Sequence, residues 1–258
     1  MPDSRRGANR GNQLQGYKTM NMRKTRFTGT DIAANIRDKY GYSGDLLDIF
    51  VGNQGPVVHK WHHYIPLYDR YLGQYRGTSF KFLEIGVSKG GSLQMWRKFF
   101  GPDATIMGID INPDCARFDG QAGMVRIGSQ DDPEFLSRVV AEMGGVDVVL
   151  DDGSHRMEHI RASFEHLFPR LSTPGLYMIE DLHTAYWTKF GGGLDSPRNF
   201  YRYLGDLIDD MHGWTHAGTP KVPGAQGSIT GIHVHDSIAV LEKAVAYTPV
   251  HSRVGRQD

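Results

Sequence analysis

Three features are scarce in this sequence, and each scarcity excludes a class of protein. Its 258 residues include one cysteine, Cys115, so no disulfide can form within the chain, which suits a reducing compartment. Basic and acidic residues balance at 29 each, so we expect no nucleic-acid partner. No apolar run approaches about 18 residues, and none follows the N-terminal arginines as in a secretory signal. These absences predict a cytoplasmic protein with no membrane partner.

The length and the residue pattern predict one large α/β domain with an N-terminal appendage. Residues 1–29 are polar and rich in Gly, Asn and Arg, which predicts a flexible arm. Residues 30–76 form a helical segment in this interpretation, and residues 77–258 form the main domain. The helices of the segment are expected near 31–40, 45–50 and 64–72.

Three histidines, His59, His62 and His63, precede the last of these helices and invite a metal-site interpretation. A hydrated helix start explains the histidines as well. The apolar residues of the helix share one face, so most of this stretch is expected to pack against the core. The better functional interpretation is that the stretch lines a cofactor pocket.

Strand and helix patterns alternate from residue 79 onward, which predicts a Rossmann-like α/β sheet with mostly parallel strands. Strands are expected at 79–85, 105–110, 124–127, 148–150 and 176–179. Two further alternating stretches, 228–235 and 237–243, predict an antiparallel C-terminal hairpin that closes the sheet. The polar ends of the parallel strands should therefore meet at one edge, where α/β proteins place their sites.

Two helices are expected in the second half of the chain. One covers 155–168 and is stopped by Pro169 and Pro174. The other covers 197–212 and begins at a Ser196 cap. Its inward side chains are expected to be Phe200, Tyr203, Leu204, Leu207 and Ile208.

A glycine-rich turn joins the first strand to a helix that should run to Phe100. Glycines let the backbone approach a ligand, and the helix start presents free N–H groups. The turn lacks the Lys-Ser/Thr ending of a phosphate loop and departs from the dinucleotide pattern G-x-G-x-x-G. Its candidate cofactor-binding residues are Glu84, Gly86, Ser88, Gly90 and Ser92.

The next strand ends in an acid, Asp110, about 20 residues further on, where ribose hydroxyls are commonly bound. Asn112 follows it, and Gln130 lies at the polar end of the third strand, where an adenine edge could be bound. Asp151 ends the fourth strand and is expected to face the cofactor. Four polar strand ends in succession favour a nucleoside pocket over four ordinary loops.

Two apolar runs, 148–150 and 176–179, end in carboxylates followed by a histidine. Because parallel strands deliver their ends to the same edge, Asp152, Glu180 and Asp181 should lie close together. Hard divalent cations such as Mg²⁺ prefer oxygen ligands, and unneutralised carboxylates this close would raise one another's pKa. His155 is expected at a helix start, whose positive dipole end disfavours imidazolium, so it is the candidate general base.

After the second carboxylate pair comes an aromatic segment with three glycines at 191–193. Its position and composition are typical of a substrate lid. The candidate substrate-binding residues are His183, Tyr186 and Trp187.

The glycine turn, Asp110 and the two stretches Leu150–His155 and Ile179–His183 together resemble a known family. They are similar to the magnesium- and S-adenosylmethionine-dependent sugar O-methyltransferases of macrolide biosynthesis, of the mycinamicin and demethylmacrocin type. The likeness covers about Lys60 to Lys243, and a related likeness extends to the cephalosporin hydroxylase family. The resemblance implies the sheet of a class I methyltransferase.

The resemblance also implies roles for the residues. Asp152, Glu180 and Asp181 would hold Mg²⁺, and His155 would deprotonate one hydroxyl of a vicinal pair on a sugar or glycoside. S-adenosylmethionine would be the methyl donor, and a homo-oligomer is expected. Some relatives carry a large N-terminal auxiliary domain, whereas about 75 residues precede the first strand here, which places macrolide-sized acceptors in question.

Two other functions stay open at this point. A catechol or other aromatic diol also chelates magnesium, and an aromatic lid suits either acceptor. A metal-dependent hydrolase or a nucleotide-binding module could use the same fold.

Overall fold

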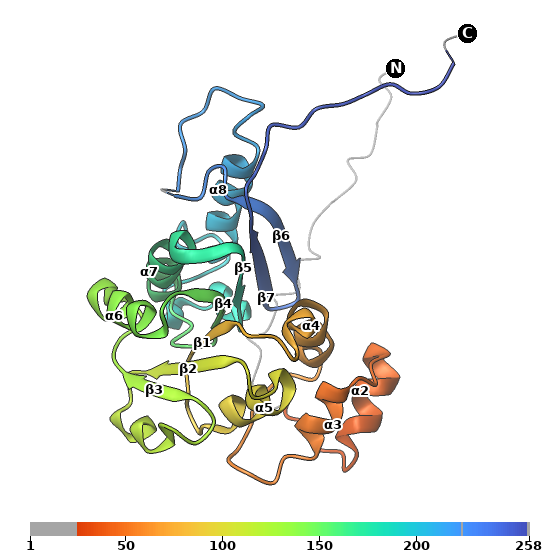
Figure 1. Cartoon of the computed structure of the whole chain (residues 1–258), viewed down its shortest axis with the longest axis vertical. Helices are drawn as coiled ribbons and strands as arrows, with labels where there is room; N and C mark the ends of the chain where they lie inside the picture. The colour runs from red at the N-terminus through yellow and green to blue at the C-terminus, as the bar shows by residue number, and fades with distance from the viewer. Residues whose placement is uncertain (1–24, 223, 257–258) are drawn as a thin grey trace, which may run out of the picture.

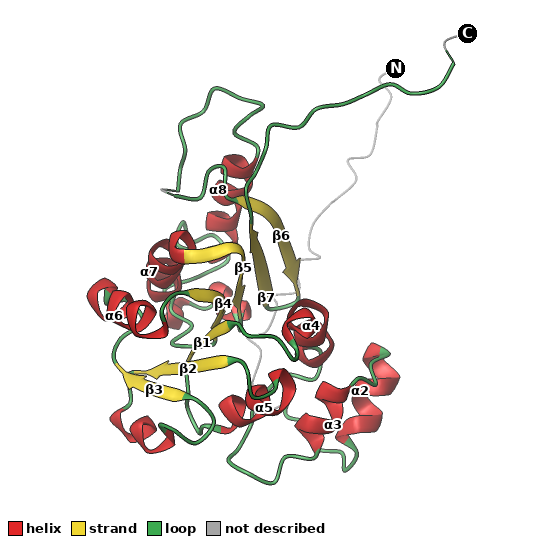
Figure 2. Ribbon diagram, in the orientation of Figure 1, coloured by secondary structure: helices red, strands yellow, loops and turns green. Residues whose placement is uncertain are grey.

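A mixed sheet of seven strands runs through the middle of the molecule (Figures 1 and 2). The computed structural model describes residues 25–222 and 224–256. The strands lie in the order β3-β2-β1-β4-β5-β7-β6, in which β1 to β5 are parallel and β7 is antiparallel to both of its neighbours. Their bounds are β1 Lys81–Ile85, β2 Thr105–Asp110, β3 Met124–Ile127, β4 Val146–Asp151, β5 Leu171–Ile179, β6 Ile229–His235 and β7 Ile238–Lys243.

Helices cover both faces of this sheet (Figure 1). The α-helices are α2 Ile32–Tyr40, α3 Asp45–Val51, α4 Tyr64–Leu72, α5 Gly91–Phe100, α6 Pro133–Met143, α7 Met157–Leu167 and α8 Phe200–Met211. Short 3-10 turns are η1 Gly73–Tyr75, η2 Pro113–Phe118, η3 Phe168–Arg170, η4 Leu182–Tyr186 and η5 Thr188–Phe190. No helix in the described part of the chain is both long and apolar enough to cross a membrane.

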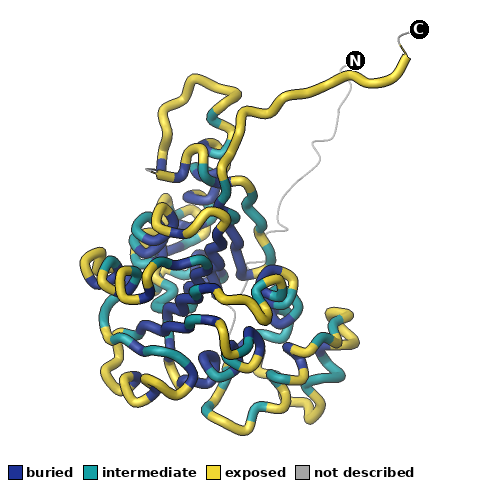
Figure 3. Tube along the Cα trace, viewed as in Figure 1, coloured by how far each residue is buried: buried dark blue, intermediate teal, exposed yellow. Residues whose placement is uncertain are grey.

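The two faces have separate cores because successive strand residues point to opposite sides. In β4, Val148 and Leu150 pack with α2 to α5, whereas Val149 packs with α6 to α8. Figure 3 shows the strands buried between these layers. The segment ahead of the sheet is thus part of one of its two cores, through residues such as Ile36 and Tyr68. The domain boundary expected at residue 77 stays a prediction.

The predicted fold is confirmed, including the antiparallel hairpin of β6 and β7, which turns at Asp236 and Ser237. The N-terminal helices also lie where the pattern placed them. Asp31 caps α2 by accepting a hydrogen bond from the amide of Ala34. The arm expected over 1–29 falls mostly on residues outside the described ones.

The helix expected from residue 155 begins later, at Met157. His155 has a positive φ of 55° and Arg156 is extended, so neither can belong to the helix. The expectation that His155 lies at the helix start was therefore wrong by two residues. Its orientation is set by the loop that follows β4.

The strand expected at 176–179 is longer, because β5 begins at Leu171 and includes Pro174. Pro174 fits there because the pairing with β4 is irregular between Leu171 and Leu176, so no ladder hydrogen bond is lost. It does not separate the helix from the strand as expected.

The last helix, α8, begins at Phe200 and not at residue 197. Asn199 caps it by accepting from the amide of Tyr201, whereas the Ser196 hydroxyl accepts from the amide of Arg198 in the preceding turn. Ile208 is 41% exposed, so its expected inward position was also wrong. The other expected inward residues of this helix are buried.

The ends of β1 and β4 approach each other very closely at Gly86. Gly86 has a φ of +100°, and a Cβ there would lie 2.1 Å from the carbonyl oxygen of Asp152. A side chain at this position would collide with the backbone that carries the acidic residues. The glycine of the predicted turn is thus required by the sheet edge itself.

Candidate active site

A cavity of about 360 Å³ opens at the carboxyl ends of the parallel strands. Its size is within the range of small-molecule sites. Strand ends after β1, β2, β3, β4 and β5 line it, together with the stretch 57–61 that precedes α4. The predicted site residues that line it are Gly86, Ser88, Ser92, Asp110, Gln130, Asp152, His155, Glu180 and Asp181.

Asp110 joins two of these strand ends. Its Oδ2 accepts from the amide of Ser88 at 2.8 Å, and its Oδ1 accepts from the amide of Asn112 at 2.8 Å. The carboxylate is therefore fixed at the cavity wall, with lone pairs left for further donors. Asn112 does not line the cavity, and its side chain caps η2.

Glu84 and Gly90, both predicted to bind the cofactor, lie behind the cavity wall. Glu84 is completely buried and accepts hydrogen bonds from Ser92 Oγ at 2.8 Å and Trp96 Nε1 at 2.9 Å. Burial raises the pKa of Glu84 to about 7, although both hydrogen bonds oppose the rise. Its observed contacts hold the first two turns of α5, including Ser92, which does line the cavity.

Asp151 also points away from the cavity, toward α7. It accepts from Ser163 Oγ at 2.7 Å and from the Gln130 amide at 3.1 Å. Gln130 in turn accepts from the amide of Ser154 at 2.7 Å. Burial raises the pKa of Asp151, against the stabilising hydrogen bond from Ser163. Asp151 thus holds Gln130, which does line the cavity.

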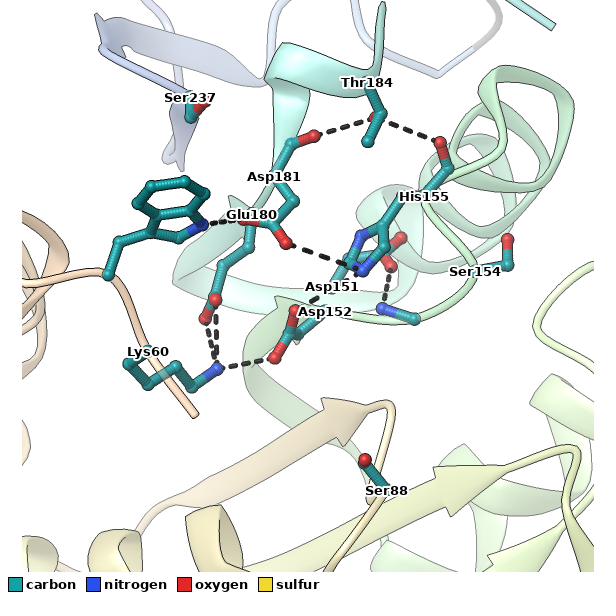
Figure 4. A network of polar contacts seen from close by, with 12 residues as sticks. Lys60, Ser88, Asp151, Asp152, Ser154, His155, Glu180, Asp181, Thr184 and Ser237 are labelled. Atoms are coloured by element: carbon teal, nitrogen blue, oxygen red, sulfur yellow. Dashed lines mark hydrogen bonds and ion pairs between the residues drawn. The ribbon is translucent and has the colours of Figure 1, made fainter. Parts of the chain in front are cut away.

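Asp152, His155 and Asp181 meet at one corner of the cavity (Figure 4). His155 Nε2 lies 3.8 Å from Asp152 Oδ1 and 3.7 Å from Asp181 Oδ2. Each of the three residues offers a potential metal-ligand atom, and these three atoms all lie within 4.8 Å of one another. The histidines of the 59–63 stretch form no such group within the described chain. We call the three residues the acidic corner.

The backbone holds this corner in an unusual way. His155 and Asp181 both have a φ of 55°, in the left-handed region that few non-glycine residues adopt. The Thr184 hydroxyl lies between them, 3.1 Å from the carbonyl oxygen of His155 and 2.7 Å from that of Asp181 (Figure 4). The loops after β4 and β5 are therefore tied together at the point where their side chains converge.

Glu180 does not join this corner. Both of its oxygens accept from Lys60 Nζ at 2.9 Å, and the same ammonium donates to Asp152 Oδ2 at 2.6 Å. Burial and the charge of Asp152 raise the pKa of Glu180, while Lys60 opposes the rise. Burial alone would lower the pKa of Lys60, but the two carboxylates raise it above its ordinary value. Lys60 is therefore a buried cation beside the predicted metal ligands.

Asp181 is held from the same N-terminal stretch. Its Oδ1 accepts from Trp61 Nε1 at 3.0 Å and from the Tyr64 hydroxyl at 2.8 Å. The sequence had indicated a pocket lining for this stretch, but not these partners. The available signal was a lysine among aromatic residues before a helix, and such a pattern does not identify carboxylates 92 to 120 residues further along the chain.

The three predicted substrate-binding residues do not line the cavity. His183 Nδ1 is 2.8 Å from Ser237 Oγ, and its ring makes edge contacts with Trp61 and Trp187. Tyr186 is 49% exposed. Their role toward an acceptor stays a prediction, as do the cofactor roles of Glu84, Gly90, Asn112 and Asp151.

Known proteins share parts of this sequence and fold. Residues 83–182 match the family described as methyltransferase domain. These residues form a methyltransferase domain. It contains the glycine turn, Asp110 and the acidic corner, whereas Lys60, Trp61 and Tyr64 lie outside the matched residues.

The methyltransferase domain has relatives with named activities. Demethylmacrocin O-methyltransferase of Streptomyces fradiae is 39% identical over 72% of this chain and 50% of its own length. The 8-demethyl-8-(2-methoxy-alpha-L-rhamnosyl)-tetracenomycin-C 3'-O-methyltransferase of Streptomyces olivaceus is 40% identical over 81% of this chain and 56% of its own length. The chain thus spans about half the length of these relatives.

The solved MycE methyltransferase of the mycinamycin biosynthetic pathway, in complex with Mg, SAH and mycinamycin VI, has the same architecture. It superposes with a TM-score of 0.71 at 36% identity, over 78% of this chain and 54% of that one. The family resemblance drawn from the motifs and the methyltransferase sheet are both confirmed.

Proposed function

We propose that this chain transfers a methyl group from S-adenosylmethionine to a hydroxyl of a sugar on a small glycosylated molecule, with Mg²⁺ bound at the acidic corner. One observation carries the proposal: Asp152, His155 and Asp181 line the same cavity as Asp110 and Gln130. A nucleoside cofactor at the polar strand ends would therefore adjoin a metal and base site. The named activities of the relatives support a sugar as acceptor.

The residues of the corner suit a hard divalent ion. Asp152 and Asp181 supply carboxylate oxygens, which Mg²⁺ prefers, and the cavity leaves room for water or acceptor oxygens as further ligands. His155 is not a typical magnesium ligand, so its place beside the carboxylates favours a role toward the acceptor. Glu180 would contribute an oxygen only by giving up part of its contact with Lys60.

In the proposed reaction, His155 Nε2 takes the proton of the acceptor hydroxyl while the oxygen forms its bond to the methyl carbon. S-adenosylhomocysteine leaves with the electrons of the broken sulfur–carbon bond. Bound Mg²⁺ would supply acidification and orientation of the hydroxyl. Asp152 and Asp181 stabilise the imidazolium, because each has an oxygen within 4 Å of Nε2. The fixed backbone of His155 keeps its ring at this position.

The test is methyl transfer from labelled S-adenosylmethionine to three acceptors: a glycosylated polyketide, its aglycone and a catechol. We expect labelling of the glycosylated compound alone, and loss of labelling with EDTA that excess Mg²⁺ restores. Labelling of the catechol alone would show that the acceptor is an aromatic diol and not a sugar. If calorimetry finds no S-adenosylmethionine binding at high micromolar concentration, methyl transfer is excluded as the activity.

We also propose that the chain works as a homo-oligomer, on the support of the family likeness. Light scattering of the purified protein tests this, and a monomeric mass at micromolar concentration would contradict it.

A further inference from the structure

A buried ammonium group, that of Lys60, lies on the opposite side of the Asp152 carboxylate from His155 (Figure 4). Lys60 Nζ lies 2.6 Å from Asp152 Oδ2 and 2.9 Å from Glu180 Oε1, and the Lys60 and Glu180 side chains are only 3% and 2% exposed. The face of the Tyr68 ring also lies beside it, with its centroid 5.6 Å from Nζ. The ammonium is thus enclosed by groups that attract a cation.

The two oxygens of Asp152 have different neighbours in this arrangement. Oδ2 accepts from Lys60, whereas Oδ1 faces His155 and the corner that offers ligands to a metal. A divalent ion at the corner would therefore be separated from the ammonium by one shared carboxylate. Two positive charges at that separation repel each other strongly in a poorly hydrated site.

The Lys60 ammonium also affects the stability of the fold, because the cluster around it is negatively charged. Asp152, Glu180 and Asp181 lie at two adjacent strand ends and carry three negative charges when ionised, and Lys60 places a buried positive charge against the first two. A buried carboxylate without a partner is strongly destabilising, so the fold should lose stability if the ammonium is lost and no metal replaces it. Lys60 therefore stabilises the cluster before a metal arrives.

We propose that Lys60 is the internal counter-ion of the metal site. It stabilises the carboxylate cluster when no divalent ion is bound, and it weakens the hold of the cluster on that ion by like-charge repulsion. This rests on the proposed magnesium site at the acidic corner. It makes Lys60 a positioning residue that sets metal affinity, from a stretch outside the matched methyltransferase domain.

The experiment compares the wild type with Lys60→Met, which keeps an unbranched side chain of nearly the same length and removes its charge. Mn²⁺ binding is measured from the electron paramagnetic resonance signal of the free ion, and thermal unfolding is measured in EDTA and in Mn²⁺. We expect Lys60→Met to bind Mn²⁺ about tenfold more tightly, from the repulsion removed. We also expect it to melt at lower temperature in EDTA and to gain more stability from Mn²⁺ than the wild type.

Two variants control the comparison. Lys60→Arg keeps the charge and should bind Mn²⁺ as the wild type does. Lys221→Met removes a surface lysine that pairs with Asp206 and Asp209, and it should leave Mn²⁺ binding unchanged. If Lys60→Met does not fold in EDTA, refolding in Mn²⁺ should restore the native circular dichroism, because the metal replaces the missing charge.

Binding of Mn²⁺ by Lys60→Met that is no tighter than in the wild type would overturn the proposal, as would failure of Mn²⁺ to rescue an unfolded variant. These outcomes differ from failure of the proposed function. In that case the wild type itself would bind no Mn²⁺ at millimolar concentration.

Discussion

His155 and Asp181 show how the site is built at the level of single residues. Each follows a different strand, yet both adopt the same left-handed backbone and point to the same corner. Such conformations cost of order 1–3 kcal/mol each and persist where surrounding contacts enforce them. Thr184 supplies those contacts, because its hydroxyl lies within hydrogen-bond distance of the carbonyl oxygens of both residues and shares its one hydrogen between them. The position of the proposed base is therefore set by the protein's own backbone contacts.

Replacement of His155 by asparagine should lower methyl transfer about 10²- to 10⁴-fold, the usual contribution of a general base. Asparagine tolerates the left-handed backbone, so the loop should keep its shape. Steady-state kinetics gives the rate, and calorimetry should find S-adenosylmethionine binding unchanged. His251→Asn, at an exposed position, is the matched control. Full activity in His155→Asn would show that another group takes the proton.

Glu84 should make stability depend on pH. Its folded-state pKa of about 7 lies above its ordinary value of 4.5, because it is buried. As pH rises between these values, the unfolded chain loses the proton first, so the free energy of unfolding falls until the folded protein also ionises near pH 7. Glu84→Gln removes this titration, so its stability relative to the wild type should be higher at about pH 8 than at about pH 5.

Urea unfolding at the two pH values measures the effect. Glutamine cannot accept both hydrogen bonds that Glu84 accepts, and this loss lowers the free energy of unfolding by the same amount at either pH. The diagnostic quantity is therefore how the stability of Glu84→Gln relative to the wild type changes between the two pH values. Glu134→Gln, an exposed change at the start of α6, is the control. The same stability difference between Glu84→Gln and the wild type at both values would contradict the raised pKa.

At the level of elements, the stretch before α4 connects the N-terminal helices to the site. Lys60 reaches Asp152 and Glu180, while Trp61 and Tyr64 both donate to Asp181 Oδ1. Donors of this kind orient the carboxylates that a metal needs. The methyltransferase domain therefore depends on a segment that precedes its first strand.

Tyr64→Phe removes one donor to Asp181 without changing the packing of the ring. We expect Mn²⁺ affinity and kcat/KM to fall about tenfold, the lower range for partners of metal ligands. This is opposite in sign to the effect expected for Lys60→Met on Mn²⁺ binding. Tyr247→Phe is the control, because Tyr247 is 81% exposed. Unchanged Mn²⁺ affinity in Tyr64→Phe would mean that Trp61 alone is sufficient to hold the carboxylate.

At the level of the whole molecule, the sheet separates two cores and gathers the site at one edge. The N-terminal helices belong to the core that also contains α5, and α6 to α8 form the other core (Figure 1). The cavity takes residues from five strand ends and from the N-terminal stretch. Ligands bound there should stabilise the entire fold, because their contacts exist only when all these segments are assembled.

S-adenosylhomocysteine at about 100 times its Kd should raise the free energy of unfolding by about 2.7 kcal/mol. For a chain of this size that corresponds to a rise in Tm of several degrees, since each kcal/mol shifts Tm by about 2–4 °C. Differential scanning fluorimetry measures it. ATP at the same concentration should have little effect. Stabilisation by ATP and none by S-adenosylhomocysteine would instead favour a nucleotide-binding module.

The sequence alone was sufficient for the order of strands and helices and for the polar ends that line the cavity. These follow from short-range rules: apolar periodicity, glycine at Gly86, and carboxylates placed directly after apolar runs. It misplaced the starts of α7 and α8, since a positive φ at His155 and the cap at Asn199 leave no clear trace in periodicity. Such ends depend on which groups are available to satisfy the first amides of a helix.

Only the tertiary structure decided which charges meet. Lys60 and Glu180 are 120 residues apart in the chain, and no spacing rule connects them. Their pairing is set by the packing of α4 against the sheet, which brings the stretch before α4 to the strand ends and buries the Lys60 ammonium against Glu180 and Asp152. The acidic strand ends could be predicted from the sequence. The cation among them, and the separation of Glu180 from the acidic corner, were determined by the fold.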